Sequence, residues 1–162
     1  MRKIFVSTTL MTGVFLAGFA YAAANGPHIG QIAPEFELND LSNKPITLSS
    51  LRKKGHVLLI FWSTRCHVCH IMLPVFKKTY EKYRQSKITI AAINVGFEGL
   101  DEVKRYTAKH AIDYLVLNDD NKKGHIASTY GLTATPTVKL IAPNGKIVWT
   151  GHHIPALKKW IK

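Results

Sequence analysis

Cysteine is scarce in this chain, whose 162 residues include only two, Cys66 and Cys69. Two cysteines cannot form the dense disulfide framework of a small secreted domain, and one Cys-x-x-Cys pair falls short of the four ligands that structural zinc takes. No internal repeat or low-complexity tract is visible, and 162 residues suit one globular domain. Any thiol chemistry therefore depends on this single pair.

Acidic residues are also few. Ten Asp and Glu stand against 22 Lys and Arg, which gives a formal net charge of +12, and no acid lies between Asp40 and Glu81. A nucleic-acid site would need basic residues interleaved with exposed aromatic residues on one surface. We interpret the excess as a solvated basic face and expect no nucleic-acid partner, while an acidic partner protein or an anionic membrane surface stays open.

The chain lacks a long, uninterrupted apolar run. Its most apolar stretch, residues 4–20, follows Arg2 and Lys3, is diluted by hydroxyl side chains, and falls a little short of the ~20 residues that span a bilayer. Small-x-small cleavage sites follow within residues 20–24. This pattern predicts a signal peptide over residues 1–24, with a retained membrane anchor as the alternative.

The remaining chain divides into two parts. Residues 25–31, which contain glycine and proline, are interpreted as a flexible leader, and residues 32–162 as one domain. In either alternative for the N-terminus this domain is exported, to the periplasm or outside the cell, where disulfides persist.

Hydrophobic patterning predicts an α/β sandwich with a mixed central sheet. Continuous apolar runs at 57–62 and 88–95 indicate buried strands, and a turn at 143–145 joins a C-terminal hairpin. Residues 66–85 are expected to be a helix kinked at Pro74, with one apolar face. That face would consist of Val68, Met72, Val75, Phe76 and Tyr80. Further elements are expected at 35–38 and 45–48 (a hairpin), at a short helix capped by Ser49, and at helices 100–110, 122–130 and 155–161.

The cysteine pair lies at the junction between the first predicted buried strand and this helix. A helix N-terminus favours a thiolate, and Arg65, His67 and His70 add cationic groups close by. We therefore expect Cys66 to be the nucleophile and Cys69, one turn inward, the resolving thiol. Because a stabilised thiolate makes the disulfide a stronger oxidant, we hypothesise a potential above the roughly −270 mV of thioredoxin.

Three other interpretations of the pair remain open. It could form a structural disulfide. The run from Cys66 to His70 also matches Cys-x-x-Cys-His, the attachment signature of c-type haem, which would make the chain an electron carrier. Finally, His67 and His70 could join the thiols in a soft-metal site of a copper-handling protein.

A second element is the proline at the start of a predicted buried strand, within Thr133-Ala-Thr-Pro-Thr137. A central strand normally excludes proline. A cis Thr135–Pro136 bond would resolve this and leave the Thr135 backbone free to pair with an extended peptide; a trans proline opening an edge strand is the alternative.

Five segments together resemble the thioredoxin superfamily, and more closely its exported TlpA-like branch, which includes the cytochrome-c-maturation thiol reductases. They are residues 32–38 (IAPEFEL), 58–64 (LLIFWST), 94–96 (NVG), 135–137 (TPT) and 143–146 (PNGK). The resemblance runs from about residue 32 to the C-terminus.

This resemblance implies a thioredoxin fold with an added N-terminal β-hairpin and a central helix–strand insertion near residues 100–130. It implies a thiol–disulfide oxidoreductase with a redox-active Cys66–Cys69 disulfide and no other cofactor or metal. Trp62, Thr135 and a cis Pro136 would contact the substrate. Partners would be cysteine-containing exported proteins and an upstream membrane or periplasmic redox partner.

The chain departs from the family pattern where the branch commonly carries other residues. Arg65 replaces a tryptophan, His67 and Val68 replace a Pro-Pro pair, and Ile60 and Met72 stand where thioredoxin and TlpA-like reductases have acids. Those acids accept a proton in reduction, so the net direction of exchange stays open, with His70 as an alternative acceptor. The peroxidatic motif of AhpC-type peroxidases is missing, and peroxidase activity is not expected.

Overall fold

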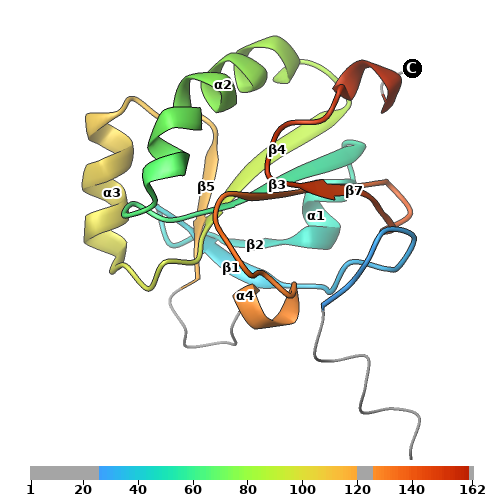
Figure 1. Ribbon diagram of the computed structural model, residues 1–162, viewed down its shortest axis with the longest axis horizontal. Helices are drawn as coiled ribbons and strands as arrows, with labels where there is room; N and C mark the ends of the chain where they lie inside the picture. Colours follow the sequence, from blue (N-terminus) through green and yellow to red (C-terminus); the bar gives the residue numbers. More distant parts are fainter. Residues whose placement is uncertain (1–25, 120–125, 161–162) are drawn as a thin grey trace, which may run out of the picture.

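The computed structural model describes residues 26–119 and 126–160 and is built on one seven-stranded mixed sheet, in the order β2-β1-β5-β4-β3-β6-β7 (Figure 1). Its strands are β1 (Glu37–Asp40), β2 (Pro45–Thr47), β3 (His56–Trp62), β4 (Ile88–Asn94), β5 (Leu115–Asn118), β6 (Thr137–Ile141) and β7 (Ile147–Gly151). The helices are α1 (Leu48–Arg52), α2 (His67–Tyr83), α3 (Leu100–Lys109), α4 (Ile126–Thr129) and the 3₁₀ helix η1 (Leu157–Trp160).

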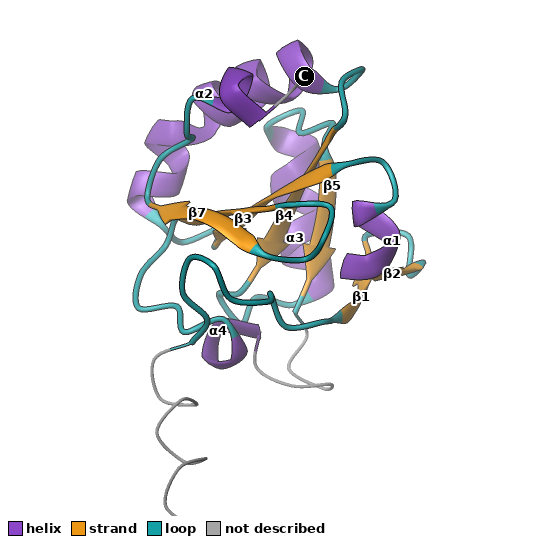
Figure 2. Ribbon diagram, turned by 90° about the vertical axis from the view of Figure 1, so that its right-hand side faces the viewer, coloured by secondary structure: helices purple, strands orange, loops and turns teal. Residues whose placement is uncertain are grey.

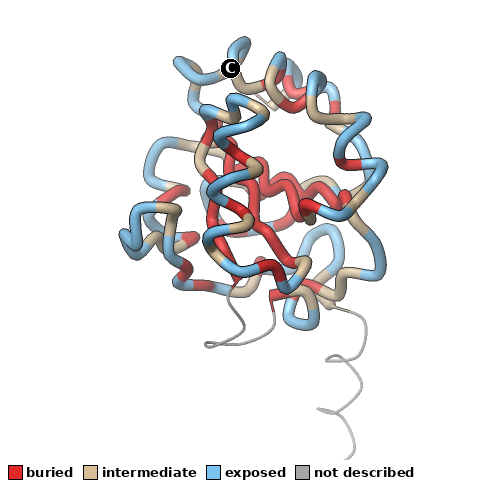
Figure 3. Tube along the Cα trace, turned by 90° about the vertical axis from the view of Figure 1, so that its left-hand side faces the viewer, coloured by how far each residue is buried: buried red, intermediate tan, exposed pale blue. Residues whose placement is uncertain are grey.

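The two faces of the sheet carry separate apolar cores. Figure 2 shows α2 and α4 on opposite sides of the sheet. Successive side chains of a strand point to opposite faces. Leu58 and Ile60 of β3 therefore pack with α2, α3 and η1, while Leu59 and Phe61 pack with α1 and α4. The central strands form the buried middle of the molecule, as Figure 3 shows.

Strand pairing brings the two sequence motifs together. β3 and β4 are parallel, with Trp62 opposite Asn94, so the loops that follow both strands leave the sheet at the same edge. β6 is antiparallel to β3, with Phe61 opposite Thr137, so the start of β6 lies at that edge too. Consequently the cysteine loop and Pro136, distant in sequence, become neighbours.

The expected fold is confirmed. β1 and β2 form the added N-terminal hairpin, and β1 joins the sheet by pairing antiparallel with β5. The insertion consists of α3 and β5, which extends the parallel part of the sheet beyond β4. The C-terminal hairpin of β6 and β7 also forms where it was predicted.

Helix α1 begins differently from the prediction. Thr47, not Ser49, is its N-cap: the Thr47 hydroxyl accepts from Ser50 N–H at 3.1 Å, and the Ser50 hydroxyl accepts from Thr47 N–H at 3.2 Å. This reciprocal capping box satisfies two backbone donors at once, whereas a cap at Ser49 would start the helix two residues later.

The expected apolar face of α2 is wrong in part. Phe76 is buried, and Met72 and Tyr80 pack partly against the core, but Val68 and Val75 are about half exposed. The helix is continuous through Pro74. Three- and four-residue spacing shows which residues share a face, not which face the sheet covers. Toward the C-terminus, the helix expected at 155–161 is the shorter 3₁₀ helix η1, and the one expected at 122–130 is described only as α4.

The described part of the leader is held against the domain. Gly30 N–H donates to Ile147 O at 2.8 Å, and Ile147 N–H donates to Gln31 O at 2.9 Å. The buried Lys139 ammonium donates to Pro27 O at 3.3 Å. Residues 26–31 therefore contact the domain through several hydrogen bonds, and their expected flexibility stays a prediction.

The predicted signal peptide, residues 1–24, lies outside the described residues. Across residues 26–119 and 126–160, none of the helices combines the length and the apolar character needed to cross a bilayer.

Candidate redox site

The cysteine pair sits in the turn from β3 into α2. Cys66 is the N-cap of α2 and is partly exposed, while Cys69, in the first turn, is 3% exposed. The two are joined by a disulfide, with their Cα atoms 5.2 Å apart. The separation of three residues places both sulfurs at the same helix end, and Cys66 is the more exposed of the two.

Two backbone groups act on the Cys66 sulfur in opposite directions. Cys69 N–H points at Cys66 Sγ from 3.1 Å, and the first turn of α2 contains no acid, so the free donors of the helix favour a thiolate. The Thr135 carbonyl oxygen lies 3.3 Å from the same sulfur on the other side. In the reduced protein a Cys66 thiol can donate to that oxygen, which favours the thiol form.

Thr135 and Pro136 form the wall opposite the disulfide. The Thr135–Pro136 peptide bond is cis, one of the two alternatives left open by the residues and the one implied by the resemblance. Pro136 is buried, and Thr137 Oγ1 donates to Ala134 O at 2.6 Å, which closes the turn.

His152 forms a hydrogen bond to the backbone of Pro136, and sequence reasoning missed this residue. Its ring Nδ1 lies 2.8 Å from Pro136 O, and because a carbonyl only accepts, Nδ1 carries the proton. His152 follows β7, the neighbour of β6, so the sheet order could have indicated that it lies near Pro136.

The expected cationic neighbours are arranged unevenly. The Arg65 side chain is mostly exposed and forms an ion pair with Glu102 at 3.1 Å, which offsets part of its charge. His67 is exposed. The His70 ring is engaged at both nitrogens: Nε2 donates to Thr64 O at 2.8 Å, and Nδ1 lies 3.1 Å from the Tyr106 hydroxyl.

Tyr106 contacts the His70 ring both by a hydrogen bond and by ring packing. Burial raises the pKa of Tyr106, so its hydroxyl remains protonated and can donate to His70 Nδ1. The ring of His70 packs edge-on against Tyr106 with centroids 5.2 Å apart. His70 therefore links the cysteine loop to α3 through its contacts with Thr64 O and the Tyr106 hydroxyl.

Trp62 is almost fully buried. It is 5% exposed and packs against Tyr106, with ring centroids 5.2 Å apart. So little exposure leaves a small area for contact with a substrate, and the expectation that Trp62 contacts one stays a prediction. Its indole forms part of the apolar floor beneath the disulfide.

A buried carboxylate anchors the cysteine loop. Glu98, 2% exposed, follows β4. Its Oε1 atom accepts hydrogen bonds from Ser63 Oγ at 2.5 Å, Thr64 Oγ1 at 2.9 Å and Arg65 N–H at 3.3 Å. A Cβ atom at Gly96 would clash with both the Glu98 carboxylate and the Ser63 hydroxyl, so the close approach requires glycine there.

This carboxylate is ionised at neutral pH. Burial alone raises the pKa of Glu98, but the hydrogen bonds from Ser63 and Thr64 outweigh it, and the pKa lies below its ordinary value. Sequence reasoning missed Glu98 because it lies far along the chain from both Cys66 and Cys69. The available signal was its position just after the second predicted buried strand, since the loops that follow parallel strands leave the sheet at one edge.

The structure also bears on the metal and haem alternatives. Within residues 26–119 and 126–160, no group of three or more His, Cys, Asp or Glu side chains is arranged to hold a metal ion. In this state Cys66 and Cys69 are joined by the disulfide, and the two ring nitrogens of His70 contact Thr64 O and the Tyr106 hydroxyl.

Comparisons with known proteins agree on one family. The model of the AhpC/TSA family matches residues 29–150. Thiol-disulfide oxidoreductase ResA of Bacillus subtilis (strain 168) is 30% identical over 154 residues, which cover 91% of this chain and 83% of that protein. ResA of Bacillus anthracis is 35% identical over 120 residues, 74% of this chain and 67% of that protein.

A solved structure gives the same fold. The thioredoxin domain of a thiol-disulfide oxidoreductase from Bacteroides vulgatus superposes with a TM-score of 0.70 at 22% identity, covering 78% of this chain and 90% of that one. At this identity the likeness is one of fold, which is the thioredoxin-like arrangement described above.

Proposed function

Since this chain belongs to the AhpC/TSA family and is a thiol–disulfide oxidoreductase of the ResA type, we propose that it is exported and exchanges disulfides with cysteine-containing proteins through Cys66. The observation that carries the proposal is the asymmetry of the pair: Cys66 is partly exposed at the N-cap of α2, while Cys69 is buried beneath it. An accessible sulfur backed by a protected one suits transfer through a mixed disulfide.

The exchange proceeds in two balanced steps. In the reduced protein the Cys66 thiolate attacks one sulfur of a substrate disulfide; a Cys66–substrate disulfide forms and the second substrate sulfur leaves as a thiolate. The Cys69 thiolate then attacks Cys66 Sγ, and the substrate's remaining sulfur leaves. The substrate has gained two electrons and is a dithiol, while the protein has lost two and holds the Cys66–Cys69 disulfide. The reverse sequence oxidises a substrate.

We place the substrate chain beside Thr135. Its carbonyl lies 3.3 Å from Cys66 Sγ, so an extended peptide that pairs with the Thr135 backbone would bring a cysteine to that sulfur. The His152 hydrogen bond to Pro136 O supports this wall from behind. Arg65 adds positive charge at the entrance, which Glu102 partly offsets.

We further propose that the protein works in the periplasm or an equivalent exported compartment, released from a signal peptide over residues 1–24 or retained there by an anchor. A membrane or periplasmic redox partner would then reset the Cys66–Cys69 pair after each exchange. We keep the hypothesis of a potential above roughly −270 mV, because the free donors at the N-terminus of α2 favour the Cys66 thiolate and so the reduced protein.

The test is a trapping experiment. Cys69→Ala retains the nucleophile but removes the resolving thiol, so mixed disulfides with substrate proteins should accumulate in extracts of the exported compartment, visible as adducts that dithiothreitol releases. Cys66→Ala is the matched control and should trap none, and it should reduce insulin no faster than buffer. Equal trapping by both variants would contradict the assignment of Cys66 as nucleophile.

A further inference from the structure

Helix α2 carries an exposed apolar stripe in addition to its buried face. Val68, Ile71 and Val75 follow one another at steps of three and four residues, so they share one side of the helix. They are 49%, 64% and 48% exposed, respectively. The stripe starts two residues after Cys66. A contiguous exposed apolar surface of this kind, on the helix that presents a reactive sulfur, is characteristic of an interaction site.

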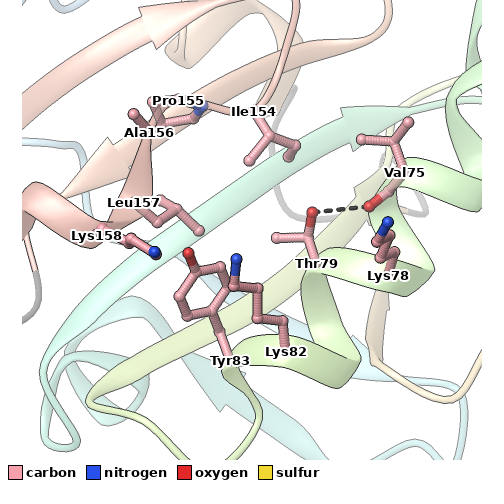
Figure 4. Close-up of a pocket in the computed structure, with 10 residues that line it drawn as sticks. All are labelled: Val75, Lys78, Thr79, Lys82, Tyr83, Ile154, Pro155, Ala156, Leu157 and Lys158. Carbon is pink, nitrogen blue, oxygen red and sulfur yellow. Dashed lines mark hydrogen bonds between the residues drawn. The ribbon is translucent and has the colours of Figure 1, made fainter.

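The stripe leads into a groove between the second half of α2 and the segment before and within η1 (Figure 4). The groove measures about 420 Å³. In Figure 4 the side chains of the helix face those of the C-terminal segment across it. Its floor is apolar or small: Val75, Thr79, Tyr83, Ile154, Pro155, Ala156 and Leu157.

The rim of the groove has one sign of charge. Lys78, Lys82 and Lys158 line it, and no acidic residue does. The only acid on α2 is Glu81, which forms an ion pair with Arg84 at 3.2 Å and is not among the lining residues. A groove that is apolar at its floor and cationic at its rim is complementary to an amphipathic segment with acidic residues around an apolar anchor.

We propose that this stripe and groove are the docking surface for an acidic, amphipathic segment of the protein that exchanges disulfides at Cys66. The proposal rests on the proposed function and names the chemistry of its partner. Docking along α2 would hold the partner's cysteine near Cys66, which raises its local concentration without altering the redox site itself.

The dimensions of α2 set the spacing in the partner. At 1.5 Å per residue, Val75 lies about 14 Å along the helix from Cys66, and Tyr83 about 25 Å. An extended chain advances about 3.3 Å per residue, so the apolar anchor should lie roughly four to eight residues from the reactive cysteine. Acidic residues should flank the anchor to meet the three lysines.

The experiment uses two synthetic peptides. Each carries one cysteine as a mixed disulfide with 2-mercaptoethanol and a Leu-Phe anchor six residues away; one peptide has four glutamates around the anchor, the other four lysines. Stopped-flow kinetics with the reduced full-length protein should give a rate constant at least ~10-fold higher for the acidic peptide at low ionic strength, with the difference shrinking in 0.5 M salt.

Variants separate this surface from the overall positive charge. Lys78→Glu with Lys82→Glu should abolish the preference for the acidic peptide. Lys44→Glu with Lys146→Glu, at exposed turns outside the groove, changes the net charge equally and should preserve it. Ile71→Gln should slow both peptides by a similar factor, because it removes part of the apolar stripe only.

Two further measurements distinguish the failures. Hydroxyethyl disulfide, a small neutral substrate, should react at the same rate with every variant. If the wild-type protein does not react with it, the proposed function fails. Binding of the acidic peptide, measured by fluorescence anisotropy, still tests the groove in that case. Equal rates and equal binding of the two peptides would overturn the docking proposal. A second result would also overturn it: anionic phospholipid vesicles bind the protein, only the Lys78/Lys82 variant loses this binding, and the two peptides react alike. That result would assign the surface to a membrane.

Discussion

At the scale of single residues, the environment of Cys66 is a balance of opposing partial charges. Cys69 N–H and the N-terminus of α2 favour the thiolate, whereas the Thr135 carbonyl favours the thiol. Glu98 adds a full negative charge that is buried and bonded to the residues just before Cys66. Because it is ionised at neutral pH, Glu98 both fixes the loop and opposes the thiolate electrostatically.

The first prediction separates those two effects. Glu98→Gln keeps an oxygen that can accept from Ser63, Thr64 and Arg65 N–H, but removes the charge. The Cys66 thiolate should become more favourable, so alkylation of reduced protein by iodoacetamide at pH 5–6 should accelerate. The disulfide potential measured against glutathione should rise by up to about 30 mV, a tenfold change in the equilibrium constant.

Glu102→Gln is the matched control, because Glu102 pairs with the exposed side chain of Arg65. The Glu102→Gln substitution should leave the charge of Arg65 uncompensated and shift the potential by less than the Glu98 substitution does. An unchanged potential and alkylation rate in Glu98→Gln would mean that Glu98 only supports the loop structurally.

At the scale of elements, the site depends on which strands are neighbours. The carboxyl ends of β3 and β4 and the start of β6 meet at one edge, and each contributes a part: the disulfide, Glu98 and Pro136. The strands themselves could be predicted from continuous apolar runs. Helix ends were harder to predict than strands. Several nearby hydroxyl side chains can form the capping hydrogen bonds to the backbone, so the sequence does not show which residue is the cap.

The second prediction tests the start of α1. Thr47→Ala removes the cap that accepts from Ser50 N–H and should lower the free energy of unfolding by about 1 kcal/mol in urea titrations. Ser49→Ala should cost less, since the Ser49 hydroxyl only contacts that of Thr47. A larger loss of unfolding free energy in Ser49→Ala than in Thr47→Ala would instead identify Ser49 as the N-cap.

At the scale of the whole molecule, a partly buried histidine and a buried carboxylate couple stability to pH in the same direction. Burial lowers the pKa of His56, whose ring lies near Trp160 with centroids 6.2 Å apart. As pH falls below about 6.5, the unfolded chain gains a proton on this histidine more readily than the folded protein does, and stability declines. Glu98 has a lowered pKa as a carboxylate, so the stability it contributes above its unfolded pKa is lost at still lower pH.

The third prediction follows from the His56 shift. His56→Phe retains an aromatic ring beside Trp160 but cannot titrate. Free energies of unfolding measured at pH 7.5, 6.5 and 5.5 should fall more steeply for the wild-type protein than for the variant. Parallel curves would show that His56 titrates alike in the folded and unfolded states.

The sequence by itself determined the chemistry and the architecture. Two cysteines with a spacing of three, at the end of an apolar run and the start of a helical pattern, place a thiol pair at a strand-to-helix turn, because periodicity and turn residues act locally. The order of apolar runs and turns likewise predicted the mixed sheet and the N-terminal hairpin, while the insertion was implied by the resemblance to the thioredoxin superfamily.

Only the tertiary structure decided which groups surround that pair and which faces stay open. Glu98 and His152 reach the site through strand pairing over long sequence separations, which no local pattern encodes. Periodicity grouped Val68 and Val75 with the buried Phe76, but the packing of α2 on the sheet left the two valines at the surface. Spacing records which side chains share a direction, while burial depends on the element that lies opposite.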